Sequence, residues 1–145
     1  MIKLHPINRE DSQTIRILTH LWNAGCGPEF ATAEAFFEYN LRPTTGGVQD
    51  GRLVYHGQTP VGFVLASAMP DVPLEIYPVT PGWIDAIVVA PEAQYKGFGG
   101  QLLLWAEQWL KKEGAGQIFV AGSMRPFMPG VPEDFTHTQS FLKGN

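Results

Sequence analysis

The glycine-rich segment that follows an apolar run is the part of this sequence whose residue types and spacing indicate chemistry. It covers Ile87–Gly100 and reads I-V-V-A-P-E-A-Q-Y-K-G-F-G-G. The turn Gln94–Gly100 leads directly into an amphipathic pattern. The first amides of a helix have no intrahelical partner and lie at its positive end, so they favour an anion. Gly97 and Gly99 lack the Cβ atoms that would keep an anion from the backbone. The segment therefore predicts a diphosphate-binding strand–loop–helix.

Two better-known glycine loops do not fit this segment. A Rossmann loop needs a glycine three positions after Gly99, where Leu102 stands. A P-loop needs Gly-Lys-Ser/Thr, but Gln101 follows Gly100. A tight turn in which the glycines serve packing alone remains the alternative.

One acidic residue, Asp85, lies inside the apolar run Trp83–Val89 (W-I-D-A-I-V-V). The two-residue period of a strand predicts that it shares a face with Ile87 and Val89. A carboxylate costs free energy in such a strand unless a function or a hydrogen bond requires it. Asp85 is therefore either a general base or a structural, hydrogen-bonded aspartate, and the sequence leaves both open.

The remaining polar side chains indicate no metal site. The single cysteine, Cys26, lies in a G-C-G-P turn, which favours a small packed thiol and excludes an internal disulfide. The histidines lack metal-ligand spacing and are expected at the surface or at caps: His5, His20, His56 and His137. Side chains that could line an acceptor site or pack in the core are Glu75, Tyr77, Trp83, Phe127 and Met128.

The elements that must position these residues follow from hydrophobic periodicity and from glycine and proline punctuation. The predicted strands are 2–7, Gly51–His56, Pro60–Met69, Trp83–Val89 and Gln117–Ala121, with Gly57–Thr59 as a hairpin turn. The predicted helices run from Asn8–Asp11 to about Ala24, over Thr32–Leu41, over Gly99–Glu113 and over Glu133–Lys143. Pro70–Pro81 and Gly122–Pro132 are predicted loops. This order predicts one α/β domain with a mixed sheet, in which a crossover joins the last two strands.

Each amphipathic helix has an expected buried face. For the first helix this face is Ile15, Leu18, Leu21 and Trp22. For the second it is Ala35, Phe36, Tyr39 and Asn40. For the helix after the glycine loop it is Leu102, Leu103, Ala106, Trp109 and Leu110.

Composition limits the class of protein. The 145 residues are 44% hydrophobic and 17% charged, which is typical of a globular domain and excludes a disordered tail. The net charge of −4 argues against nucleic acid or an anionic membrane as the main partner. No apolar run reaches the length of a signal peptide or of a membrane helix, and we expect a cytoplasmic protein.

The glycine segment resembles the acetyl-CoA motif V-x-P-x-x-Q/R-x-x-G-x-G/A of the GNAT superfamily of N-acyltransferases. The matching residues are Val89, Pro91, Gln94, Gly97 and Gly99. The resemblance implies a GNAT-like fold, acetyl-CoA as cosubstrate and direct attack of an amine on the thioester. It also implies that the backbone of Ile87, Val88 and Val89 pairs with the pantetheine arm, with Val89 N–H as donor to the thioester carbonyl. The implied pyrophosphate-binding residues are Gln94, Tyr95, Lys96, Gly97, Phe98, Gly99 and Gly100.

The sequence departs from the family where a late tyrosine usually protonates the leaving thiolate. There is no tyrosine after Tyr95, and Ser140 is the hydroxyl offered by the matching region, S-F-L-K-G-N. A non-catalytic acyl-CoA-binding module is therefore the alternative to an enzyme. The acceptor, a small-molecule or peptide amine, would be selected by the loops around Thr32–Gly47 and Pro70–Pro81.

The family normally has two more strands than this sequence provides, so residues 1–145 are expected to be a C-terminally incomplete GNAT domain. Gln117–Ala121 would then be an apolar edge strand, which invites pairing with a second copy or a second GNAT domain. Short matches at Leu21–Ala24 (L-W-N-A) and Pro129–Pro132 (P-G-V-P) resemble proteins that carry two GNAT domains in tandem.

Overall fold

The computed structural model describes residues 2–26, 34–41, 47–70, 75, 79–94 and 96–120. Within these ranges the chain forms a five-stranded sheet and three α-helices. The elements are, in order, β1 (Lys3–Pro6), α1 (Ser12–Cys26), α2 (Glu34–Asn40), β2 (Val48–His56), β3 (Thr59–Ala68), β4 (Pro81–Val89), α3 (Phe98–Lys112) and β5 (Gln117–Val120). The strands lie side by side in sequence order; β1 to β4 are antiparallel, and β5 runs parallel to β4. This confirms the predicted mixed α/β fold.

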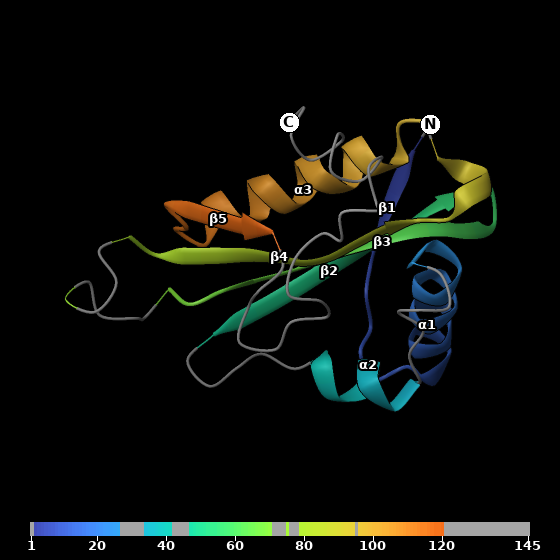
Figure 1. Cartoon of the computed structure of the whole chain (residues 1–145), viewed down its shortest axis with the longest axis horizontal. Coiled ribbons are helices and arrows are strands. Elements are labelled where there is room, and N and C mark those ends of the chain that lie inside the picture. The colour runs from blue at the N-terminus through green and yellow to red at the C-terminus, as the bar shows by residue number, and fades with distance from the viewer. Residues whose placement is uncertain are drawn as a thin grey trace.

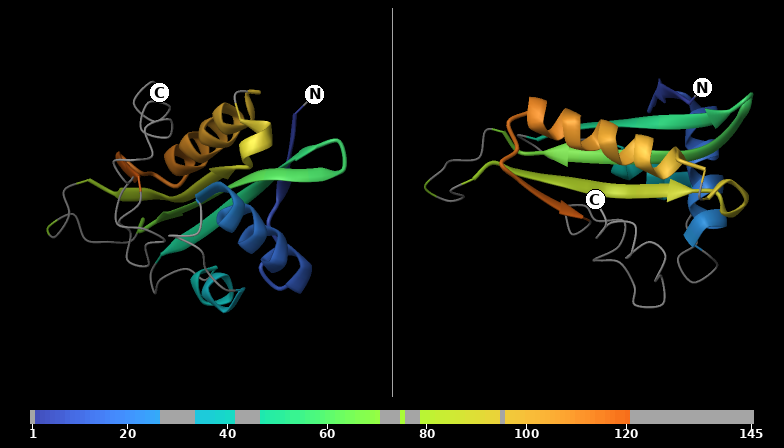
Figure 2. Two further views of the ribbon diagram at one scale, coloured as in Figure 1. Left: turned by 45° about the vertical axis from the view of Figure 1, so that its right-hand side comes forward. Right: turned by 90° about the horizontal axis from the view of Figure 1, so that it is seen from above.

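The sheet is covered on both faces. Figures 1 and 2 show α1 and α2 against one face and α3 against the other. Two hydrophobic clusters result, because successive side chains of a strand point to opposite faces. The cluster beneath α1 and α2 contains Ile15, Leu18, Leu21, Trp22, Phe37, Leu41, Leu53, Phe63, Leu65, Ala86, Val88 and Ala90. The cluster beneath α3 contains Val54, Val61, Val64, Ala66, Ala68, Ile84, Ala93, Phe98, Leu102, Leu103, Ala106 and Leu110.

Most predicted element boundaries agree with the structure to within three residues. The β2–β3 hairpin is confirmed with the shorter turn Gly57–Gln58, and β2 begins at Val48 rather than Gly51. α1 continues through Gly25 to Cys26, where the sequence predicted a break. Asp11 caps this helix: its Oδ1 accepts the Gln13 N–H at 3.0 Å and its Oδ2 accepts the Thr14 hydroxyl at 3.2 Å.

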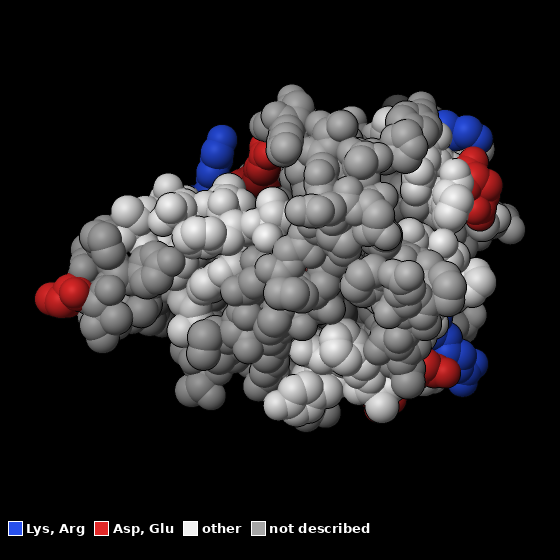
Figure 3. Space-filling view, in the orientation of Figure 1, with Lys and Arg blue, Asp and Glu red and all other residues white. Residues whose placement is uncertain are grey.

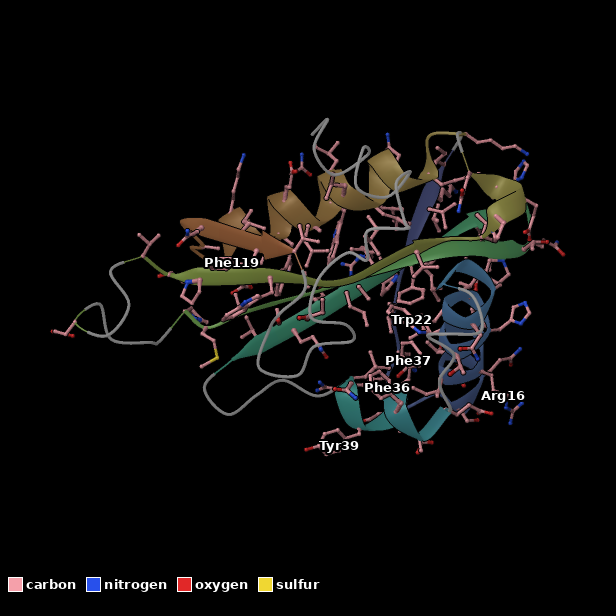
Figure 4. All side chains as sticks on the ribbon, viewed as in Figure 1. Arg16, Trp22, Phe36, Phe37, Tyr39 and Phe119 are labelled. Carbon is pink, nitrogen blue, oxygen red and sulfur yellow. The ribbon has the colours of Figure 1, made fainter. Side chains whose placement is uncertain are left out.

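The predicted inner face of α2 is wrong in part. The fully buried aromatic residue of this helix is Phe37. The sequence had instead predicted that Ala35 and Tyr39 would lie on the inner face. Its ring meets those of Trp22 and Phe63 edge-on, at centroid distances of 6.3 and 6.0 Å. Figure 4 shows Phe37 directed towards the sheet and Tyr39 directed outwards, where it is 60% exposed. The expected burial of Asn40 is confirmed. Its Nδ2 donates to the Phe36 carbonyl at 2.8 Å, which satisfies the amide group at this buried position.

Several predictions lie outside the described residues: the loop Gly122–Pro132, the helix Glu133–Lys143, Ala121 and most of Pro70–Pro81. Pairing of the β5 edge with a second chain or domain also stays a prediction. In the part of the chain that the structure describes, no helix is both long and apolar enough to cross a membrane. On the face drawn in Figure 3, the coloured basic and acidic groups lie around the margin and are intermixed.

Candidate active site

The end of β4 lies next to the glycine-rich loop. β4 pairs with β3 from Gly82 to Val89, and its described pairing with β5 runs from Pro81 to Ile84, which lies opposite Val120, the last described residue. From Ala86 to Val89, no described residue pairs with the side of β4 that faces away from β3. Among the described residues, this side of β4 is an open edge of extended backbone.

The alternation of backbone hydrogen bonds along β4 shows which residues direct their N–H and C=O groups to this edge. The Ala90 N–H donates to the Val61 carbonyl at 2.7 Å, which fixes the phase of the antiparallel ladder between β3 and β4. Because residues in such a ladder alternate in direction, the backbone groups of Val88 point to β3, and those of Ile87 and Val89 point to the open edge. The Gln94 side chain agrees with this phase, since its Nε2 donates to the Val89 carbonyl at 3.2 Å.

Asp85 lies at a β-bulge of β4. Ala86 pairs with Leu65 and Ile84 pairs with the next residue of β3, Ala66, so Asp85 is the additional residue in β4. The side chain of Ile84 consequently shares the α3 face with Ile87, although the two are three residues apart. Because the bulge interrupts the two-residue period, the predicted common face of Asp85, Ile87 and Val89 stays a prediction.

Asp85 is 3% exposed, so any role in proton transfer requires a path to it through the site. Two aromatic rings stack near this part of β4, one on β4 itself and one on β5. Trp83 pairs in register with Phe119 of β5, and their rings stack at 6.3 Å with an interplanar angle of 29°. Trp83 is half-buried and therefore remains able to line an acceptor site.

The loop after β4 ends in an uncapped helix start. Gly97 is the N-cap of α3, with φ of 87°, a left-handed conformation that favours glycine. It supplies no side-chain cap, and the first turn contains no acidic residue. The first helical bond described runs from the Gln101 N–H to the Gly97 carbonyl at 3.2 Å. The preceding amides, of Phe98, Gly99 and Gly100, therefore lie at the positive end of α3 without a side-chain acceptor.

Packing fixes this loop against the end of the sheet. The Ala93 N–H donates to the Ala90 carbonyl at 2.9 Å, and Ala93 is buried. Phe98 is buried in the cluster beneath α3, and the His56 ring lies 5.6 Å from its ring. Lys96 and Gly97 remain exposed at the mouth of the loop. The structure thus brings Ile87, Val88, Val89, Gln94, Lys96, Gly97, Phe98, Gly99 and Gly100 to one end of β4.

The other candidate residues that the structure describes form no metal-binding cluster with the residues at the end of β4. His5 packs edge-on against Tyr55 at 4.8 Å, and His20 is exposed on α1. The described residues include no cluster of three or more His, Cys, Asp or Glu side chains that could hold a metal ion. Glu75 is exposed. Tyr77, Tyr95, Phe127, Met128, His137 and Ser140 lie outside the described residues.

Sequence reasoning missed the bulge in β4. A bulge depends on which residues of the neighbouring strand lie opposite β4. A run such as W-I-D-A-I-V-V predicts a buried strand, but it does not show which residues of the neighbouring strands pair with it. The interruption of the apolar run by Asp85 is the one local signal that this strand is irregular.

The described residues form a mixed α/β sheet in which β4 leads into a glycine-rich helix start. The model of the acetyltransferase (GNAT) family matches residues 13–126, and the chain belongs to this family. A search of curated proteins gave no match.

Solved structures of acetyltransferases share the fold. A GCN5-related glucosamine N-acetyltransferase region of a fungal multi-domain GH3 β-N-acetylglucosaminidase superposes with a TM-score of 0.85 at 21% identity, over 99% of this chain and 16% of that one. The chain therefore spans about a sixth of the fungal protein's length. An aminoglycoside acetyltransferase from an uncultured soil metagenomic sample, in complex with sisomicin, gives 0.69 at 13% identity, over 99% of this chain and 86% of that one. The aminoglycoside N-acetyltransferase AAC(6')-Iy in complex with CoA gives 0.67 at 16% identity, with the same coverages.

Proposed function

We propose that this protein is an N-acetyltransferase that moves an acetyl group from acetyl-CoA to a small-molecule amine. The observation that carries the proposal is the open edge of β4 beside the uncapped start of α3. An acyl-CoA presents a diphosphate and an amide-containing arm, which need an anion site and an extended hydrogen-bonding edge. The described residues fit both needs. Similar structures include a complex with CoA and one with the amine sisomicin.

The loop fixes the direction in which the cosubstrate lies. The diphosphate would accept bonds from the amides of Phe98, Gly99 and Gly100, with Lys96 as a nearby cation. The arm would then run back along β4, from Val89 towards Asp85. These residues are four positions apart, which corresponds to roughly 13 Å of strand. In this proposal the thioester lies near Ile87, the open-edge residue closer to Asp85, so that the acceptor amine is near the proposed base.

This direction changes the expected donor to the thioester carbonyl. Ile87 and Val89 both present their backbone groups to the open edge, while Val88 is committed to β3. We assign the bond to the thioester carbonyl to Ile87 N–H, and the bonds to the arm to Val89. A fixed amide at the carbonyl oxygen stabilises the negative charge that develops there as the amine attacks.

The reaction forms one bond and breaks one. The amine nitrogen attacks the carbonyl carbon, a C–N bond forms, and the C–S bond breaks to release the CoA thiolate. The protonated amine first loses one proton through ordered water to Asp85. The second proton, which the nitrogen loses once the C–N bond has formed, passes through water to the CoA thiolate and gives the free thiol. An amine of pKa about 10 is mostly protonated near neutral pH, so a base that removes its proton accelerates the reaction.

The burial of Asp85 favours a second candidate, a non-catalytic acyl-CoA-binding module. Both candidates require the cosubstrate to bind at β4 and α3, and only the enzyme requires transfer. Release of free thiol from acetyl-CoA in the presence of a panel of amines distinguishes the two.

Amide hydrogen exchange tests the shared binding mode. Acetyl-CoA should slow exchange of the Ile87 and Val89 amides, by up to about 100-fold at 100 times the Kd. The Val88 amide, already bonded to β3, should change far less. Equal protection of all three amides, or protection of none, would contradict the assignment.

A pair of variants tests the diphosphate site: one changes the loop and the other is its control. Gly99→Glu places bulk and negative charge at the diphosphate and should weaken acetyl-CoA binding in calorimetry. Gln108→Glu adds the same charge to the exposed middle of α3 and should leave the affinity unchanged. The negative charge in Gly99→Glu lies near the helix N-terminus, where it favours folding of α3. Equal affinities for the two variants would remove the diphosphate from this loop.

A further inference from the structure

Gly25 stands in the last turn of α1, where the sequence predicted that the helix would break. Within a helix, glycine is less favourable than alanine, because it loses more backbone freedom on folding. The described glycines with positive φ are Gly57, Gly97 and Gly114, so Gly25 does not act as a left-handed helix cap. The absence of a side chain at this position therefore has another reason.

Gly25 allows α1 to pack directly on β4. A Cβ atom at this position would lie 2.5 Å from Val88 Cγ1 and 3.6 Å from the Val89 carbonyl oxygen. Carbon atoms in contact lie about 3.5–4.0 Å apart, so an alanine would push α1 away from β4 by roughly 1 Å. Val88 cannot easily give way, because it is buried in the cluster beneath α1 and α2.

A second glycine lets α3 approach the same part of β4 from the other face of the sheet. Gly62 of β3 pairs with Val89. A Cβ atom at Gly62 would lie 3.3 Å from Leu102 Cδ1, near the start of α3, and 2.7 Å from the Val88 carbonyl oxygen. Figure 1 shows α1 and the start of α3 on opposite faces of the sheet at this end of β4. Both helices are thus close to the backbone along which the CoA arm is proposed to lie.

The contact made by Gly25 is at the open edge of β4. The Val89 carbonyl faces this edge, where it accepts a hydrogen bond from Gln94 Nε2 at 3.2 Å. Gly25 remains half-buried, whereas Val88 beneath it is buried. The last turn of α1 therefore borders the open edge, at the end nearest to the proposed diphosphate site.

The arm of CoA is widest at the part that would lie beside this turn. A single methylene group separates the diphosphate from a carbon that carries two methyl groups, and the rest of the arm is narrower. With the diphosphate at the amides of Phe98, Gly99 and Gly100, this carbon comes to the Val89 end of the edge. Methyl groups gain free energy when a protein surface removes them from water.

We propose that Gly25 is a positioning residue, which brings the last turn of α1 against the two methyl groups of the CoA arm. The inference rests on the proposed function for the place of the arm, but it does not require acetyl transfer. An acyl-CoA-binding module without activity would use the same contact.

Calorimetry on the full chain tests the inference by comparing CoA with ADP, which ends at the diphosphate. Gly25→Ala moves α1 away from β4 and should weaken CoA binding about tenfold, because the two methyl groups lose their apolar contact. The affinity for ADP should stay unchanged. His20→Ala is the control, since it also places a better helix former in α1, at an exposed position, and both affinities should then be unchanged.

A second substitution beneath Gly25 tests the cause of the loss. In the double variant Gly25→Ala with Val88→Ala, the methyl group added to α1 replaces one removed from β4, so α1 can return. Its CoA affinity should lie within about threefold of that of Val88→Ala alone, whereas two independent effects would multiply. The thermal unfolding of each variant is measured to confirm that it is folded at the temperature of the titration.

Three results would overturn the inference alone: unchanged CoA affinity in Gly25→Ala, an equal loss of affinity for ADP and CoA, or no recovery in the double variant. A wild-type chain that does not bind CoA would overturn it together with the proposed function. CoA binding with the expected losses but without acetyl transfer to any amine would support the inference and contradict the proposed enzyme.

Discussion

Asp85 lies at the bulge of β4 against β3, directly after Ile84, which pairs with Val120 of β5. The sequence predicted that an acidic residue would be buried in this strand, because the surrounding residues are apolar. It did not predict the bulge, since a bulge depends on the residues opposite and not on the strand's own composition. The start of a helix near Gly97 and Gly99 was easier to predict, because glycine punctuation is a local property of the sequence, and the anion-binding role of this turn stays a prediction.

The substitution Asp85→Asn tests whether Asp85 acts as the general base. The substitution keeps the shape of the side chain and removes its ability to take a proton, so kcat should fall by about 10²–10⁴ near neutral pH. Affinity for acetyl-CoA should stay close to that of the wild type. The deficit should shrink as the pH approaches the amine pKa of about 10, where the acceptor no longer needs a base. Steady-state kinetics over this pH range give the answer; an unchanged kcat would leave Asp85 with a structural role alone.

At the scale of elements, α1 and α3 were predicted well and α2 was not. α1 and α3 are each 15 residues long, so four or five apolar positions define one face. α2 has seven residues, E-A-F-F-E-Y-N, with three aromatic rings spread around it. Two turns of helix do not show which ring faces the sheet, and the choice is made by Trp22 and Phe63.

The contrast between two aromatic residues of α2 tests this arrangement. Phe37→Ala removes a fully buried ring and should lower the free energy of unfolding by about 3–5 kcal/mol. Tyr39→Ala, two residues away on the exposed side, should change it by about 0.5 kcal/mol or less. Urea unfolding followed by circular dichroism measures both. A larger loss in Tyr39→Ala than in Phe37→Ala would show that α2 presents the opposite face to the sheet.

At the scale of the whole molecule, the two clusters share a single sheet, and the proposed cosubstrate site lies at its opening. β4 contributes the side chains of Ala86 and Val88 to one cluster and that of Ile84 to the other, against which Ile87 and Val89 also pack. The backbone groups of Ile87 and Val89 face the open edge. A ligand bound along this edge supplies hydrogen bonds that no described strand provides there. Its binding free energy therefore adds to the stability of the folded sheet as a whole.

Acetyl-CoA should for this reason raise the midpoint of thermal unfolding of the entire domain. A ligand at 100 times its Kd stabilises the folded state by about 2.7 kcal/mol. A domain of this size shifts by about 3 °C per kcal/mol, so the expected rise is roughly 8 °C. Gly99→Glu should lose most of this rise, and Gln108→Glu should retain it, with both read by differential scanning calorimetry against their ligand-free forms. Because the proposed site for the arm is on β4 and the proposed site for the diphosphate is at α3, one unfolding transition should move as a unit. A ligand-induced split into two transitions would show that β4 and α3 do not form one binding unit.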